Sequence, residues 1–184
     1  MSKGILSWGK PRIFVKKLDS AGESTYQYRE LPTPVDDSTN LETTEGDKTE
    51  AKIEGGEVEA VRYDKSTYKL TMQFRMKVGS KMPFENSDGV VTDNYEVVLA
   101  PEHAEAFGLQ MKEAHVSIKS SFTTNDGVLV DVSFDALTQG KDESGKDIPQ
   151  CQFGVVKVSG TETAGDLNVE FTKITAEEDK LIEG

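Results

Sequence analysis

The clearest pattern of hydrophobic and polar positions lies between Thr67 and Val78. Apolar residues occupy every second position there: Tyr68, Leu70, Met72, Phe74, Met76 and Val78. Side chains alternate across a strand with a period of two, so the segment is predicted to be a long strand with one dry and one wet face. The wet face carries Lys69, Arg75 and Lys77 in an otherwise acidic chain, and we therefore expect it to meet another surface.

A second alternating pattern predicts a β-hairpin later in the chain. Apolar residues alternate with polar ones over 114–122 and again over 128–136. The turn signal Asn125-Asp126-Gly127 separates the two runs, and its glycine supplies the positive φ that tight hairpins need. Lys119 and Asp131 are expected to lie near one another across this hairpin, without a register that the sequence alone defines.

Further apolar runs predict strands over 12–18, 26–31, 95–99, 151–158 and 167–172. Pro101–Phe107 carries helix signals, with proline at its start, acids in the first turn and Gly108 beyond its end. Thr175–Glu178 resembles a capping box that opens a short acidic helix, or else a frayed tail. About nine strands and one short helix predict a mainly β fold: an antiparallel β-sandwich or barrel-like sheet with a short flanking helix.

The segment Ser38–Tyr63 is mostly polar and allows two interpretations. A turn is predicted at Gly46–Asp47, and a second bend or bulge at Gly55–Gly56. One interpretation is a solvated mobile loop. The other is a two-stranded arm that projects from the core and pairs with a neighbour, since an isolated hairpin is marginal in water.

Composition narrows the function without identifying a reaction. The 184 residues include 21 basic and 33 acidic ones, a formal net charge of -12, which is opposite to the balance of most proteins that wrap nucleic acid. A single cysteine, Cys151, excludes an intramolecular disulfide framework, and His103 and His115 have no partner at metal-ligand spacing. We expect no enzyme, cofactor or metal site. No apolar run is long enough for a signal peptide or a membrane span, so we expect a soluble protein made in the cytoplasm.

Three stretches carry a resemblance to a known family. They are the opening Ser2–Val15, the elbow Glu30–Thr39 and the segment Leu41–Gly56, and the later Val132–Ala136 fits the same group. In pattern and order, from Ser2 to Val158, the chain resembles the tail tube (major tail) proteins of long-tailed bacteriophages. Residues 1–158 would then form the tube-like β-sandwich domain, with its arm at about 38–63, and 159–184 a C-terminal strand followed by a short helix or tail.

The resemblance implies a structural virion protein in the phage tail, assembled in the bacterial host. Such subunits form hexameric rings that stack into a tube, and strands of all six close one barrel through which DNA passes without specific binding. The implied partners are further copies of the chain, with tape-measure, tail-terminator and baseplate or sheath proteins. A long arm reaches an adjacent ring, and we place Leu41–Val61 in that role by its position and polarity.

The arm supplies most of the expected contact residues: Leu41, Gly46, Asp47, Lys48, Ile53 and Val58. Trp8 is either a packing anchor or a contact with a neighbouring subunit. An acidic channel wall repels phosphates, and the candidates for it are Glu42, Glu45, Glu50, Glu54, Glu57, Asp131 and Asp135. Each of these acids is also compatible with an ordinary solvated position.

Two other functions remain open from the sequence. The tube subunit of a phage-like injection system would share the fold and differ in its partners. A monomeric β-sandwich binding module would expose aromatic residues and commonly be secreted, whereas this chain has one tryptophan and no export signal.

Overall fold

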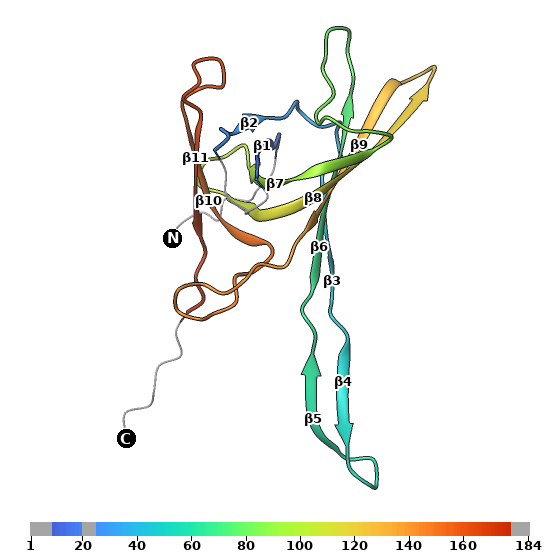
Figure 1. Cartoon of the computed structure of the whole chain (residues 1–184), viewed down its shortest axis with the longest axis vertical. Coiled ribbons are helices and arrows are strands. Elements are labelled where there is room, and N and C mark those ends of the chain that lie inside the picture. Colours follow the sequence, from blue (N-terminus) through green and yellow to red (C-terminus); the bar gives the residue numbers. More distant parts are fainter. Residues whose placement is uncertain (1–8, 20–24, 178–184) are drawn as a thin grey trace.

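The computed structural model describes residues 9–19 and 25–177, and within them the chain folds into strands joined by turns and loops (Figure 1). The eleven strands of this part are β1 (Arg12–Lys17), β2 (Arg29–Glu30), β3 (Asn40–Thr44), β4 (Lys48–Lys52), β5 (Val58–Tyr63), β6 (Thr67–Arg75), β7 (Val90–Ala100), β8 (Phe107–Thr123), β9 (Gly127–Ala136), β10 (Gln152–Ser159) and β11 (Asn168–Lys173). The predicted mainly β class is confirmed.

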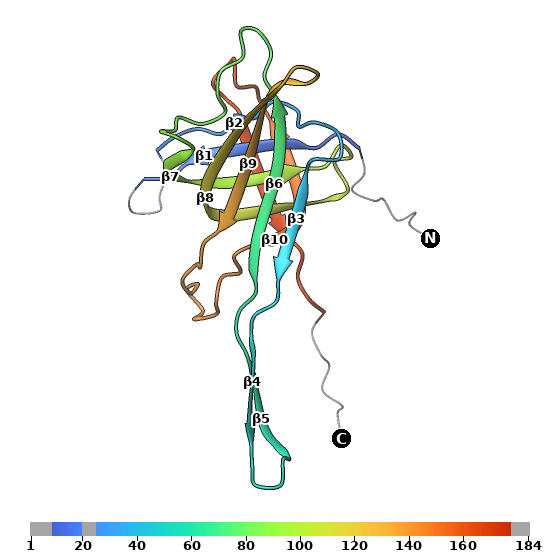
Figure 2. The same ribbon diagram turned by 90° about the vertical axis from the view of Figure 1, so that its right-hand side faces the viewer.

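Nine of these strands form one antiparallel sheet: seven follow the order β2-β1-β7-β8-β9-β6-β3, and β10 and β11 branch off at β8. The 17-residue strand β8 organises it. Its first part pairs with β7 on one side and with β10 on the other, and its last part pairs with β9. β11 pairs in turn with β10. Because β8 belongs to both parts, the sheet folds over on itself in a sandwich-like arrangement rather than lying flat (Figure 2).

The main core lies between the β1–β7 layer and the β6–β9 layer. The dry face of β6 contributes Leu70, Met72 and Phe74, all nearly inaccessible, as the alternation predicts. Phe84, from the loop after β6, packs edge-on against Phe134 at a ring-centroid distance of 5.7 Å. This loop therefore belongs to the core although it lies outside any strand.

A second, smaller core covers the opposite face of the β1–β7 layer. Phe14 and Val98 pack there against Val156, Leu167 and Val169 of the β10–β11 side. β1 and β7 are consequently buried on both faces, which is why the centre of β1 is a continuous apolar run and does not alternate.

Residues 40–75 form a long two-stranded ribbon that leaves the body. Its base, β3 paired with β6, belongs to the main sheet, and its end, β4 paired with β5, forms a separate two-stranded sheet. Figures 1 and 2 both show β4–β5 pointing away from the rest of the molecule. The segment is therefore a projecting two-stranded arm and not an unpaired loop, and the pairing of this arm with a neighbour stays a prediction.

Of the two bends predicted in this segment, the one at Gly55–Gly56 is confirmed and the one at Gly46–Asp47 is wrong. The chain runs straight through Gly46–Asp47, from β3 into β4, and reverses at Gly55–Gly56, where both glycines have positive φ. Gly46 is needed for another reason, since a Cβ atom there would collide with the carbonyl oxygen of Asp64 on the opposite strand. Close backbone approach and a tight turn favour the same residue type, which explains the wrong prediction.

The predicted helix at Pro101–Phe107 is also wrong. The segment forms turns, with the Ala106 amide donating to the His103 carbonyl at 3.0 Å, and Phe107 already begins β8. Seven residues give a helix little to offset its nucleation cost, so pairing of β8 with β7 and β10 decides the conformation. Thr175–Glu177 shows no helix, and Glu178 lies outside the described residues.

Two strand predictions are corrected at their ends. β6 stops at Arg75, three residues early, and Val78 is fully exposed in the following turn instead of extending the dry face. The strand predicted over 26–31 is limited to Arg29 and Glu30.

Candidate assembly surfaces

Four neighbouring strands present a polar outer face. They are β8, β9, β6 and β3, and their outward residues form rows across the sheet; we call this surface the polar face. One row consists of Glu42, Lys69, Asp135 and His115, and the next but one of Gln73, Asp131 and Lys119. The apolar residues that alternate with them along each strand point inward to the main core.

Charges on the polar face alternate in sign. Lys69 Nζ lies 4.0 Å from Asp135 Oδ1, and Lys119 is directly opposite Asp131, as expected. The Gln73 side chain donates to Asp131 Oδ1 at 2.7 Å. The basic character of β6 is thus compensated by acids of β9, and the face as a whole is mixed rather than basic or acidic.

The structure brings together three of the seven acids proposed for a channel wall. Glu42, Asp131 and Asp135 lie on the polar face. Glu50 lies on β4, beyond the main sheet, where it forms ion pairs with Lys48 and Lys52. The other three also lie outside it, between β3 and β4 or around the ribbon turn: Glu45, Glu54 and Glu57.

The expected contact residues lie along the ribbon. Leu41 is at its base and packs against the main core, Gly46 and Asp47 lie between β3 and β4, and Ile53 and Val58 flank the turn. Lys48 begins β4 opposite Tyr63. Trp8 lies outside the described residues.

The ribbon end exposes apolar side chains. Every residue of β5 is exposed, including Val58, Val61 and Tyr63, and Tyr63 shows 67% of its surface. Apolar residues on a two-stranded ribbon with no third layer are unprotected in a single copy.

The polar four-stranded sheet has two open edges within the described residues. β3 is the last strand of the sheet order. At the other side β7 accompanies β8 only as far as Ile118, whose amide donates to the Gly89 carbonyl at 3.1 Å. Beyond that point β8 has β9 on one side and no described strand on the other.

Phe122 stands at the open edge of β8 and was not singled out from the sequence. It lies opposite Val128 on the apolar side of the hairpin, beyond the end of the core, and 71% of its surface is exposed. The signal was present, because the alternation that predicts β8 continues through Phe122. Only the structure shows that the layer covering β8 ends earlier.

A groove of about 770 Å³ lies beside β3. Its walls include Pro11, Pro34 and Val35, and its apolar lining is completed by Leu41, Leu70, Leu99 and Leu109. The groove is on the same side of the sheet as Leu41, that is, on the inward side of the polar four-stranded sheet.

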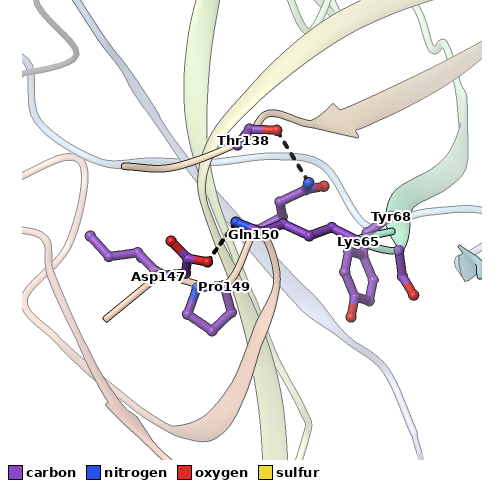
Figure 3. Close-up of a pocket in the computed structure, with 8 residues that line it drawn as sticks. Lys65, Tyr68, Thr138, Asp147, Pro149 and Gln150 are labelled. Carbon is purple, nitrogen blue, oxygen red and sulfur yellow. Dashed lines mark hydrogen bonds and ion pairs between the residues drawn. The ribbon is translucent and has the colours of Figure 1, made fainter. Parts of the chain in front are cut away.

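A smaller cavity of about 240 Å³ lies at the root of the ribbon (Figure 3). The Gln150 side chain, 8% exposed, donates weakly to Thr138 Oγ1 at 3.4 Å, and its Oε1 atom has no partner in the described part. The ion pair between Lys65 and Asp147, 2.9 Å apart, borders the cavity and lowers the pKa of the Asp147 carboxyl.

Two further groups with a raised pKa, Tyr28 and Cys151, have structural explanations. Burial, followed by the nearby Glu96 carboxylate, raises the pKa of Tyr28, whose hydroxyl donates to Glu96 Oε1 at 2.8 Å. Glu96 also receives Gln110 Nε2 at 2.6 Å and Lys16 Nζ at 2.8 Å, so its charge is matched. Burial raises the pKa of the Cys151 thiol to about 11, so it remains protonated at neutral pH.

Comparisons with known proteins do not place the chain in a family. No protein-family model matches it, and no match to a curated protein was found. In the described residues, no cluster of acids, histidines or cysteine could hold a metal ion, and no helix has the length and apolarity to cross a membrane.

Proposed function

We propose that the chain is a subunit of a phage tail tube, whose copies join side by side into rings and stack into a conduit for DNA. The observation that carries the proposal is the polar sheet β8–β9–β6–β3, at each side of which residues 9–19 and 25–177 leave an open edge. Free strand edges are a liability for a protein that acts alone, and closure into a barrel removes them.

The direction of the strands supports repeated joining. Each neighbour in the four-stranded sheet is antiparallel, so β3 and β8 run in opposite directions. The β3 strand of one copy would therefore meet the β8 strand of the next as another antiparallel pair, with all copies in the same orientation. An arrangement of this kind is heterologous, and it closes as a ring when the rotation between copies divides a full turn.

The polar face would line the channel in this proposal. Its acids alternate with Lys69 and Lys119, so the wall would offer DNA phosphates no continuous basic surface and little counterion release. Three of the seven acids named for an acidic wall, Glu42, Asp131 and Asp135, lie on this face, and the lysines beside them make the proposed wall charge-balanced instead of acidic.

The ribbon would connect one ring to the next. In Figures 1 and 2 its end, β4–β5, extends beyond the body at the lower end of the molecule. This end exposes Val58, Val61 and Tyr63. Burial of these side chains against a neighbouring copy would remove about 25 cal/mol of unfavourable free energy for each Å² of apolar surface covered.

Electron microscopy and light scattering of the purified full chain at increasing concentration test the proposal. Rings or tubes are expected, and their width and stacking would also distinguish a tube from irregular aggregates. A species of 20.2 kDa that persists at every concentration would overturn the proposal and favour a monomeric binding module. An injection-system tube would assemble in the same way and differ in the partners it recruits.

A further inference from the structure

The two open edges are complementary in their main-chain groups. The Ile118 amide points outward to Gly89, and since main-chain groups alternate in direction along a strand, those of Ser120 and Phe122 also point outward. On β6, Gln73 directs its carbonyl to the Val35 amide and its amide to Ser38 Oγ, away from β9. Thr71 likewise points its main-chain groups toward β3, at its partner Asn40. Since the direction alternates along β3, the main-chain groups of Leu41 and Thr43 point away from β6, to the open edge.

In both strands the outward main-chain groups belong to residues whose side chains lie on the apolar side. Joining Leu41 and Thr43 to Ser120 and Phe122 therefore continues the sheet without exchanging its two faces. A shift by one residue would place polar-face residues opposite apolar-side ones, so only registers that differ by two residues remain.

The tilt of the strands against the axis of a closed barrel excludes some of these registers. Within one copy Glu42 lies in the same row as His115. Across the joint, Glu42 would lie opposite a residue of the next copy that is farther along β8. A six-residue offset, to Ser121, is about 20 Å, and four strands span about 19 Å, which gives a tilt of about 45°. Offsets of four and eight residues give about 35° and about 54°, and barrels typically tilt by about 35–45°.

Side-chain chemistry distinguishes the two tilts that remain. With Glu42 opposite Ser121, Leu41 lies opposite the exposed Phe122, and Thr43 lies opposite Ser120. The Phe122 ring would then enter the groove beside Leu41. With Glu42 opposite Lys119 instead, Leu41 would face Ser120, and Phe122 would pass beyond the start of β3. The second register would gain an exposed ion pair between Glu42 and Lys119, worth less than about 1 kcal/mol. It would leave the Phe122 ring without an apolar partner, so the first register is favoured.

We propose that copies of this chain join through an antiparallel β3–β8 contact in which Leu41 of one copy lies opposite Phe122 of the next, and that the groove at Leu70 and Leu109 receives the Phe122 ring. This inference rests on the proposed function, since it specifies the joint between subunits of a ring. The partner is a second copy of the chain, and the register states which residue of one copy lies opposite which residue of the next.

Disulfide trapping tests the register directly. In the proposed joint, Glu42 and Ser121 form a non-hydrogen-bonded pair, with Cα atoms about 4.5 Å apart, within the range that a disulfide can bridge. Within one copy the same residues are separated by three strand spacings, about 14 Å, and in addition by six residues, about 20 Å, along the strands, so they cannot be bridged. Oxidation of the Glu42→Cys/Ser121→Cys variant in a Cys151→Ala background should therefore link separate copies into a ladder that ends at the ring.

The matched control moves one cysteine by a single register step. Glu42→Cys/Lys119→Cys places the two residues on a diagonal about 7–8 Å apart and should give little cross-linking. Equal or stronger linking of this control would overturn the proposed register. If rings form but neither variant links, the joint is different while the proposed function survives. If no assembly forms at any concentration, the proposed function itself fails.

A second pair of variants tests the apolar contact without cross-linking. Phe122→Ser should raise the concentration of half-assembly by at least about tenfold, because the joint loses a buried aromatic side chain. The control is Ile174→Ser, directly after β11, which removes another exposed apolar side chain away from both edges and from the groove, and which should leave assembly unchanged. Circular dichroism of the monomers checks that both variants fold. Unchanged assembly of Phe122→Ser would contradict the contact.

Discussion

At the residue scale, burial follows the alternation of the sequence closely wherever a second layer covers the strand. Phe74 is 1% exposed and belongs to the main core, whereas Val78, four residues later in the same pattern, has no layer over it. The two residues have equivalent positions in the period, and tertiary contacts alone make the difference between them.

Substitution of Phe74 by alanine is expected to lower the free energy of unfolding by about 3–5 kcal/mol, since it removes a buried ring and leaves a cavity. Urea denaturation followed by circular dichroism measures this loss. Val78→Ala, in the exposed turn after β6, should change the free energy of unfolding by less than about 0.5 kcal/mol. Comparable losses in the two variants would show that Phe74 is not a core residue.

The ion pair of Arg12 and Glu30 predicts a pH dependence. Arg12 Nε and Nη2 each donate to a Glu30 oxygen at 2.8 Å, and this hydrogen bonding lowers the pKa of the Glu30 carboxyl below its ordinary 4.5. The stabilisation is thus complete above pH 4.5 and is lost as the pH falls through the lowered value. Solvent exposure keeps it below about 1 kcal/mol.

Arg12→Met should therefore be less stable than the unmodified chain at pH 7, and the difference should shrink progressively as the pH is lowered below 4.5. Thermal unfolding across that pH range provides the measurement. Arg62→Met is the control, because its 3.6 Å contact with Asp64 is largely exposed and should contribute almost nothing at any pH. A constant difference down to the acid limit would exclude the pair as its cause.

At the scale of elements, strands with one covered face are predictable and short connections are not. The hairpin β8–β9 follows from alternation and a turn signal in the sequence. The segment Pro101–Phe107 has helix signals at both ends, yet the long-range pairing of β8 determines its conformation. Glycines in the ribbon illustrate the same limit, since the sequence does not distinguish a turn at Gly55–Gly56 from the close crossing at Gly46.

Gly46→Ala is expected to loosen the ribbon, because the added Cβ atom would press against the main chain of Asp64 and Lys65. Amide hydrogen exchange in β4 and β5 should become at least about tenfold faster, corresponding to about 1.4 kcal/mol of local opening free energy. The control Gly140→Ala has open space around its Cβ position and no positive φ, so it should leave exchange unchanged. Unchanged ribbon exchange in Gly46→Ala would mean that the two strands are not held this closely.

At the scale of the whole molecule, the body and the ribbon end have separate energetics. Neither core contains a residue of β4 or β5, so the body does not depend on them. The open edges of β3 and β8 belong to the body, and the exposed apolar residues of β5 belong to the ribbon. The proposed ring joint and the proposed contact between rings can therefore be removed one at a time.

Replacement of Lys48–Tyr63 by an Asn-Gly turn should change the free energy of unfolding of the body by less than about 1 kcal/mol. Assembly is expected to stop at single rings, since the β3–β8 joint remains and the inter-ring contact is lost. Electron microscopy distinguishes rings from tubes. Long tubes formed by the shortened chain would show that the ribbon does not connect the rings.

The sequence by itself determined the mainly β class, the dry face of β6, the β8–β9 hairpin and a polar segment before β6, because these features depend on local period and turn chemistry. It also contained Glu42, Asp131 and Asp135, but not their common face. Only the tertiary structure decided that β8 extends beyond Ile118, where its pairing with β7 stops, and that β3 is the last strand of the sheet in the described part of the chain. Edges arise from which strands pair across long separations, and no local pattern encodes those pairings.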